Sequence, residues 1–185
     1  MQRYAVPTDL SCDQVVDWLN TNSPYAPEWA ETRSTYTFGG QVRTAVTAEP
    51  DGTFTARIRG HSGLRVAVRS PVDVPNWTPS ERPNRAAEVR AWGAMRASLD
   101  AHEADHGRIA QRERARIEGE YRALDISATG ATRAEARAAA VAKLRAQQQQ
   151  WQAETQAAQH AIDPFRGAVL SCPAPPAAPG DDAPP

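Results

Sequence analysis

The hydrophobic positions of this chain follow two different periods. Between Thr32 and Val74 apolar and polar residues alternate, which is typical of strands with one buried face. After Asn84 the apolar positions recur at steps of three and four, which is typical of helices with one buried side. The pattern predicts an α+β protein in which a small sheet precedes the long helices.

Three or four short strands are expected in the first region. They are rich in β-branched and aromatic residues and are bounded by turn-forming residues. A strong turn signal, Glu-Pro-Asp-Gly, occupies positions 49–52 and favours a hairpin between its flanking segments. The sequence therefore predicts a small antiparallel sheet, with strands at about 35–38, 42–47, 53–58 and 64–68.

A short helix is expected before the sheet, at about residues 9–20. Asp9 or Ser11 is a candidate N-cap, and apolar residues recur along one side of the segment. Four prolines between residues 71 and 83 then predict a linker around Trp77, which leads from the sheet to the long helices.

Two long helices are expected after this linker, at about residues 84–125 and 132–162. The segment Asp125–Gly130 reads as a turn between them, and Thr132 is a candidate cap for the second helix. Two helices joined by a short turn pack antiparallel to each other. We therefore expect a helical hairpin that turns near residue 129.

Length and composition limit the classes of function. The chain has 185 residues, so residues 1–170 suffice for a single domain with its own core. The Pro/Ala-rich tail, residues 173–185, is expected to be disordered. A net charge of −1 argues against nucleic-acid binding, and no apolar run is long enough to span a membrane.

The two cysteines and the start of the chain bear on its location. A disulfide between Cys12 and Cys172 would close a very long loop, although two unrelated buried thiols fit the spacing equally well. The sequence after Met1 does not resemble a signal peptide. The chain is expected to be secreted or periplasmic if a leader was removed, and cytoplasmic otherwise.

The sharpest motif is His102-Glu103-Ala104-Asp105-His106, which reads H-E-x-x-H. On a helix, residues four apart project from the same face, so two imidazoles can bind one Zn²⁺ ion. Glu103 beside them would act as the general base for a metal-bound water. Both histidines lie on the apolar side of the expected helix. The alternative is a pair of core histidines and a glutamate in a salt bridge.

A zinc site also needs a third protein ligand. If the hairpin turns near residue 129, the motif faces Glu154, which makes this carboxylate the first candidate. The alternatives are a solvated surface role for Glu154, or ligation by His160, whose side chain is expected to point away from the apolar face. Gln152 is a poor zinc ligand, and His61 is expected in a surface loop.

Several segments resemble a family of predicted secreted zinc-dependent bacterial proteases known as domain of unknown function 922. They are the opening Arg3-Tyr4-Ala5-Val6, the segments 31–36 and 74–77, and residues 92–110 around the motif. The resemblance implies a zincin-like fold. It also implies a Tyr-Asp-x-x-Thr pattern with a following histidine on the second helix. Here Thr155 fits that pattern, but Gln152 replaces the aspartate and the histidine is missing.

The sequence therefore predicts a zinc-dependent metallohydrolase, most simply a metallopeptidase acting on a peptide. Its expected ligands are His102, His106 and Glu154, with Glu103 as the general base. A non-proteolytic, metal-dependent enzyme acting on a small molecule or peptide is the second hypothesis. A binding protein whose histidines serve only the core is the third.

Overall fold

The structure is a computed structural model that describes residues 1–26, 28–163, 165 and 169–174. The chain forms two compact units. Unit 1 comprises Met1–Arg33, Pro71–Asp105 and Pro164–Pro185, and unit 2 comprises Ser34–Ser70 and His106–Asp163. The expected tail of residues 173–185 lies outside the described part of the chain except for its first two residues.

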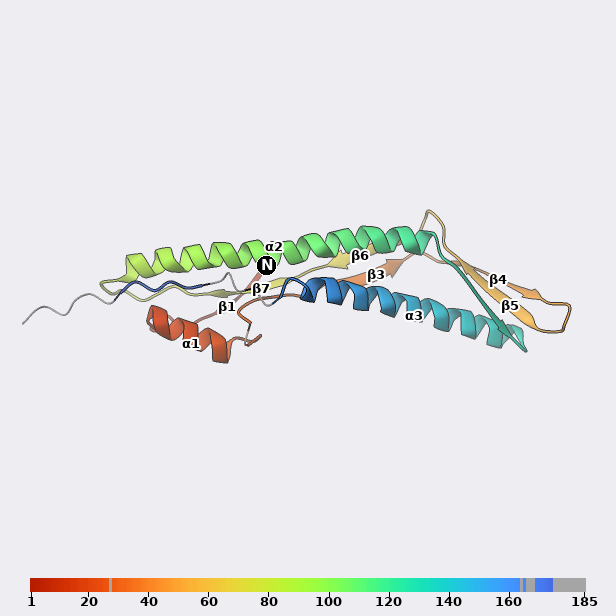
Figure 1. The fold of residues 1–185 in the computed structure, drawn as a ribbon, viewed down its shortest axis with the longest axis horizontal. Helices are drawn as coiled ribbons and strands as arrows, with labels where there is room; N and C mark the ends of the chain where they lie inside the picture. Colours follow the sequence, from red (N-terminus) through yellow and green to blue (C-terminus); the bar gives the residue numbers. More distant parts are fainter. Residues whose placement is uncertain (27, 164, 166–168, 175–185) are drawn as a thin grey trace, which may run out of the picture. The chain divides into compact units, whose positions relative to one another are not determined.

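Unit 1 contains a small sheet, a short helix and the first half of a long one (Figure 1). Its three strands lie in the order β1-β7-β2, with β1 parallel to β7 and β2 antiparallel to it. The sequence-based expectation missed these strands, and it placed a linker where β7 lies. The elements are β1 (Gln2–Ala5), α1 (Cys12–Asn22), β2 (Glu31–Thr32), β7 (Val72–Asn76) and the beginning of α2 (Arg85–Arg122).

Helix α1 begins at a capping box. The Ser11 side chain accepts from the backbone N–H of Gln14, and the Gln14 side chain accepts from the backbone N–H of Ser11. Of the two candidate caps, Asp9 and Ser11, the structure has Ser11. The buried side of α1 packs with residues of β7 and α2 into the core of unit 1, which includes Val15, Leu19, Val74, Trp77, Trp92, Met95 and Leu99.

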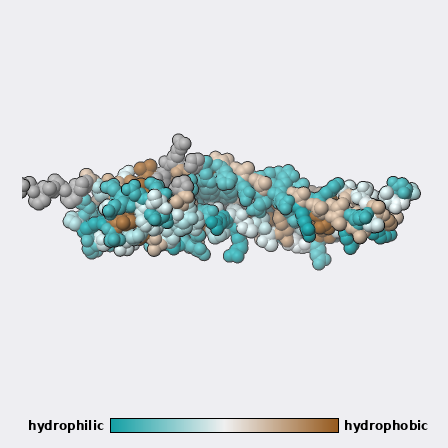
Figure 2. Space-filling view, turned by 90° about the horizontal axis from the view of Figure 1, so that it is seen from below, coloured by the Kyte–Doolittle hydropathy of each residue, from teal (hydrophilic) through white to brown (hydrophobic). Residues whose placement is uncertain are grey.

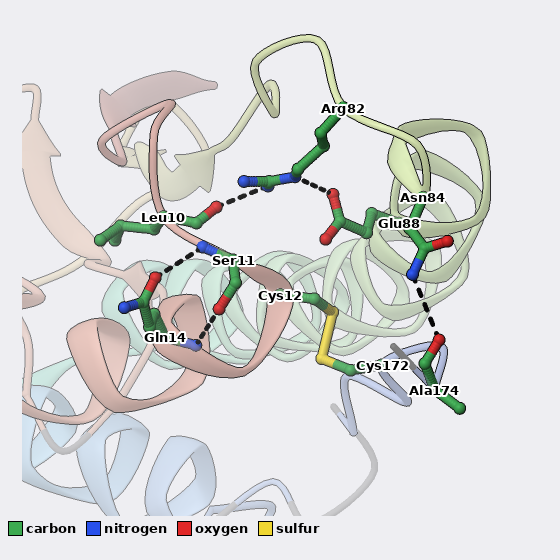
Figure 3. Close-up of a disulfide and its surroundings, with 9 residues drawn as sticks. All are labelled: Leu10, Ser11, Cys12, Gln14, Arg82, Asn84, Glu88, Cys172 and Ala174. Carbon is green, nitrogen blue, oxygen red and sulfur yellow. Dashed lines mark hydrogen bonds and ion pairs between the residues drawn. A yellow bond between two sulfur atoms is a disulfide. The ribbon is translucent and has the colours of Figure 1, made fainter. Parts of the chain in front are cut away.

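A disulfide joins Cys12 in the first turn of α1 to Cys172, so the pairing that the sequence left open is formed (Figure 3). The two Cα atoms are 5.5 Å apart. Beside the bridge, Asn84 donates a hydrogen bond to the carbonyl oxygen of Ala174. The segment around Cys172 is thereby attached to both α1 and the start of α2.

Unit 2 contains two further sheets and two helical segments. Strands β3 and β6 form one antiparallel pair, and the other sheet has the order β4-β5-β8. The sequence predicts three or four strands in one small antiparallel sheet; a strand lies in each of the four expected segments, but these strands belong to two separate sheets. The elements are β3 (Thr35–Gly39), β4 (Arg43–Ala48), β5 (Phe54–Arg59), β6 (Arg65–Arg69), β8 (Asp125–Gly130), the second half of α2, and α3 (Arg133–His160).

The segment expected as a simple turn, Asp125–Gly130, is strand β8. It pairs antiparallel with β5, and Ile126 lies opposite Ile58. The missed signal is the alternation of Ile126 and Ala128 with polar neighbours, which places apolar side chains on one face of the sheet. Gly130 ends the strand where an added Cβ atom would lie 2.5 Å from the backbone nitrogen of Ala136.

Helices α2 and α3 run antiparallel within unit 2, as expected. Arg116 forms an ion pair with Glu154, and the Trp151 indole N–H donates to Glu120. Because β8 occupies the connection, the two helices pair in a different register from that of a tight hairpin. Glu154 consequently lies beside Arg116 and not beside residue 104. In the part of the chain that the structure describes, none of the helices has the length and apolar character that a membrane crossing requires.

Candidate metal centre

The H-E-x-x-H motif lies on the uninterrupted helix α2. His102 and His106 are one turn apart, so their side chains leave the same side of the helix. All three motif residues are buried, with relative exposures of 8% for His102, 4% for Glu103 and 6% for His106. Ionisable side chains are rarely buried this deeply without charged or hydrogen-bonding partners.

Two polar side chains of unit 2 contact the His106 ring. The Nδ1 atom is 2.5 Å from Oε1 of Gln159 on α3. The Nε2 atom is 3.2 Å from Oδ1 of Asp163, which follows the end of α3. The two ring nitrogens therefore have different partners, and these partners determine which nitrogen carries the proton.

The orientation of the Gln159 amide is set by its other contacts. Its Nε2 donates to the backbone oxygen of His106 at 3.2 Å and to Oγ of Ser34 at 3.5 Å. Its Oε1 atom therefore faces Nδ1 and, being a carbonyl oxygen, can only accept. Nδ1 of His106 must carry the proton. A metal-binding histidine commonly has this arrangement, with the second nitrogen donating to a carbonyl.

The other nitrogen of His106 faces a carboxylate. With Nδ1 protonated, Nε2 of the neutral ring has a lone pair, and an ionised Asp163 offers only acceptor oxygens. Two acceptors 3.2 Å apart repel unless a proton or a metal cation lies between them. The pair is therefore suited either to an imidazolium–carboxylate ion pair or to shared coordination of a cation.

Three residues form a group that could hold such a cation. One ligand atom each from His102, His106 and Asp163 lies within 4.8 Å of the other two. Two atoms bound to the same zinc ion at about 2.0–2.2 Å are at most about 4.4 Å apart. Binding of one zinc ion by all three would therefore require these atoms to lie closer together than the 4.8 Å limit. Two imidazoles and one carboxylate are a donor set that zinc accepts.

Glu103 is held by a residue of β2. The Thr32 hydroxyl donates to Oε2 of Glu103 over 2.6 Å, and both residues belong to unit 1. A short hydrogen bond from a hydroxyl to a carboxylate stabilises the ionised form and fixes the direction of the carboxylate. Sequence reasoning identified Glu103 but missed Thr32, because no local spacing connects a two-residue strand to a helix.

The ring of His102 stacks on Phe165. The two ring centroids are 4.3 Å apart and the planes differ by 11°. Both residues belong to unit 1, which also contains the Cys12–Cys172 disulfide. The aromatic face restricts rotation of the imidazole and covers one side of it. Residues of unit 1 thus orient two side chains of the motif: Thr32 orients Glu103, and Phe165 orients His102.

The other sequence-based candidates are not members of this group, although His160 lies near Asp163. Glu154 forms an ion pair with Arg116 at 2.9 Å and accepts from Gln150 at 2.8 Å. The side chain of His160 is 81% exposed, and its Nδ1 is 4.0 Å from Oδ2 of Asp163. His61 contacts the backbone oxygen of Gln41 through its Nε2 atom. Among the sequence-predicted ligands, only His102 and His106 belong to the group.

Comparison with known proteins identifies the family. The chain matches the family described as bacterial protein of unknown function (DUF922) over residues 2–161. No curated protein and no solved structure matches the chain. The match confirms the resemblance noted in the sequence, and the family description names no activity. Because the matched region covers most of the chain, the protein is a member of the DUF922 family.

Proposed function

We propose that this protein is a zinc-dependent hydrolase, most simply a metallopeptidase. The observation that carries the proposal is the convergence of His102, His106 and Asp163, whose ligand atoms lie within 4.8 Å of one another. Asp163 takes the place that the sequence-based hypothesis gave to Glu154. Three protein ligands leave a fourth coordination position for water or substrate, as catalytic zinc sites require.

Each ligand has a distinct role in holding the ion. His106 would bind through Nε2, because its Nδ1 donates to Gln159. His102 would bind with its ring plane fixed by Phe165. Asp163 would supply the single negative charge among the ligands. A bound zinc ion would supply Lewis acidity, which lowers the pKa of a coordinated water to about 7 and polarises a substrate carbonyl.

Glu103 is the proposed general base. Its carboxylate is buried next to His102 and is oriented by the Thr32 hydroxyl. A base that removes a proton from the attacking water can return it to the leaving amine of a peptide. The hydrogen bond from Thr32 to Oε2 would keep the carboxylate in one orientation during both transfers.

The position of Thr32 supports a peptide as the substrate. Thr32 belongs to β2, which lies at one edge of the sheet β1-β7-β2 in the described part of unit 1. An extended peptide can add to such an edge through main-chain hydrogen bonds. A peptide aligned along β2 would pass the residue that binds Glu103, so its scissile bond would lie near the proposed base.

The test separates metal binding from catalysis. The full chain is prepared without chelator, and its zinc content is measured by mass spectrometry for the wild type and for Glu103→Gln, His102→Ala and Asp105→Asn. Each protein is then incubated with a peptide mixture from digested casein, and new termini are identified by mass spectrometry. Asp105 is an exposed carboxylate of the same motif and serves as the control.

The expected result is about one zinc per chain in the wild type, Glu103→Gln and Asp105→Asn, and little in His102→Ala. Cleavage should be lost in Glu103→Gln and retained in Asp105→Asn. A wild type with little zinc would contradict the metal site. Zinc binding together with unchanged cleavage by Glu103→Gln would contradict the role of Glu103.

A further inference from the structure

A second feature of the molecule lies in unit 2 and does not involve the metal-binding group. A groove of about 820 Å³ lies between β4 and the first half of α3. Val46 of β4 and Val141 of α3 contribute to an apolar lining, together with small alanine side chains. Figure 2 shows pale and tan residues interspersed with teal ones over the end of unit 2 that holds β4 and the start of α3.

Three arginines also line this groove. Arg133, Arg137 and Arg145 recur along α3 at multiples of four residues, which places them on one side of the helix. Arg133 lies over the ring of Phe54 at 5.2 Å. Among the described residues, no ion pair joins Arg137 or Arg145 to a carboxylate, and no acidic residue lines the groove. The groove is therefore cationic with an apolar lining.

Val46, the β4 residue in the groove lining, belongs to an edge strand of its sheet. In the order β4-β5-β8, strand β4 pairs with β5 on one side only in the described part of the chain. The N–H and C=O groups that point away from β5 can accept another strand. Val46 lies opposite Ala56, whose side chain packs against alanines of α3, so alternate side chains of an added strand would point to the side of the sheet on which α3 lies.

We propose that β4 and the α3 arginines form a docking site for an extended acidic peptide segment of a partner protein. Main-chain hydrogen bonds to β4 would hold the segment, and its acidic side chains would pair with Arg137 and Arg145. A peptide is favoured over nucleic acid or an anionic membrane because the groove combines a strand edge with an apolar lining. The proposal is independent of zinc binding and of the proposed hydrolase activity.

The test uses a defined probe and the full-length protein. The probe is a fluorescein-labelled peptide of about eight residues that alternates valine and glutamate, a length that matches a typical strand. Binding is measured by fluorescence anisotropy, and mass spectrometry confirms that the probe stays intact. The variant is the double charge reversal Arg137→Glu with Arg145→Glu. Its control is Arg69→Glu with Arg90→Glu, two exposed arginines outside the groove.

We expect saturable binding of the acidic probe and none of a valine–lysine probe. The groove variant should raise the Kd at least about tenfold, because two favourable charge pairs become repulsive, whereas the control should change it by less than about twofold. N-methylation of the probe provides the second measurement. Only one alternate set of its N–H groups faces β4, so methylating that set should abolish binding and methylating the other should not.

Three results would overturn the proposal. The first is the absence of saturable binding by the acidic probe. The second is an equal effect of both N-methylated sets, since attraction between charges alone does not depend on strand hydrogen bonds. The third is tighter, arginine-dependent binding of single-stranded oligothymidylate or of phosphatidylserine vesicles, which would assign the groove to nucleic acid or to a membrane surface.

Discussion

The side chain of Gln159 fixes the tautomer of His106. Its carbonyl oxygen is 2.5 Å from Nδ1, and its amide nitrogen donates to the backbone oxygen of the same histidine. One side chain thus contacts both the ring and the main chain of His106. Nε2 is left to face Asp163, and this makes Gln159 the natural first target for testing the metal centre.

Replacing Gln159 with leucine should weaken zinc binding without removing a ligand. Loss of such an outer partner typically costs about 10–100-fold in metal affinity, because the ring loses both its orientation and its tautomer preference. Competition with a chromophoric chelator measures this change. The matched control is Gln156→Leu, an exposed glutamine of the same helix. Equal affinities of the two variants would argue against the role of Gln159.

Substitutions at Asp163 and at Glu154 should affect zinc occupancy differently, and this difference identifies the third ligand. Asp163→Asn removes the carboxylate beside His106 and should reduce zinc occupancy strongly, because a neutral amide is a poor zinc ligand. Glu154→Gln disturbs only an exposed ion pair with Arg116 and should leave the occupancy unchanged. Zinc content after dialysis against a weak chelator distinguishes the two. The reverse pattern would restore Glu154 as the ligand.

Removing the disulfide should destabilise unit 1. The bridge spans a sequence separation of 160 residues, and cross-links that close long loops contribute about 2–5 kcal/mol, largely through the unfolded chain. Urea unfolding followed by tryptophan fluorescence should show a lower midpoint for Cys12→Ala with Cys172→Ala. Adding a reductant should lower the midpoint of the wild type and leave that of the double variant unchanged. A wild-type urea midpoint that does not change on adding the reductant would contradict this prediction.

Unit 2 should lose stability in acid through Glu118. The backbone N–H of Val66 donates to this carboxylate at 2.8 Å, and with nearby Arg122 and Arg114 it lowers the pKa of Glu118. A lowered folded-state pKa means that the stabilisation is complete above the ordinary glutamate value of about 4.3. It is lost as the pH falls through the folded-state pKa.

The measurement is the urea midpoint at pH 7 and at about pH 3. The Glu118→Gln variant should have a lower urea midpoint than the wild type at pH 7. Its midpoint should also fall less than that of the wild type between pH 7 and about pH 3. Glu28→Gln serves as the control, since Glu28 is exposed and belongs to unit 1. Parallel pH profiles of the wild type and Glu118→Gln would show that this carboxylate does not contribute.

The parts of the fold that sequence predicts here are those with a local signal. The hairpin of β4 and β5, the caps Ser11 and Thr132, and both long helices follow from periodicity and turn residues. The strands β1, β2 and β7 carry no comparable signal, because they are short and each pairs with a strand distant in sequence. Such pairing depends on the tertiary fold, which outweighs local propensity.

In the candidate site, too, some residues could be predicted from local sequence and others could not. Helical spacing alone places His102 next to His106 on one face. The third ligand depends on the register between α2 and α3, and the missed strand β8 changes that register, so Glu154 was inferred where Asp163 lies. Gln159 and Thr32 act through contacts between elements, which no short motif encodes.

The placement of β8 also has a consequence for the newly synthesised chain. The β4–β5 hairpin leaves the ribosome before all of α2, whereas β8 follows α2. Until β8 arrives, the second edge of β5 lacks its native partner, and an open edge invites pairing with other chains. The sheet is completed only when β8, which is distant in sequence, pairs with β5, and such pairing is slower than the pairing of neighbouring strands. Translation speed and chaperone access during the synthesis of α2 should therefore influence how much of the protein reaches the native state.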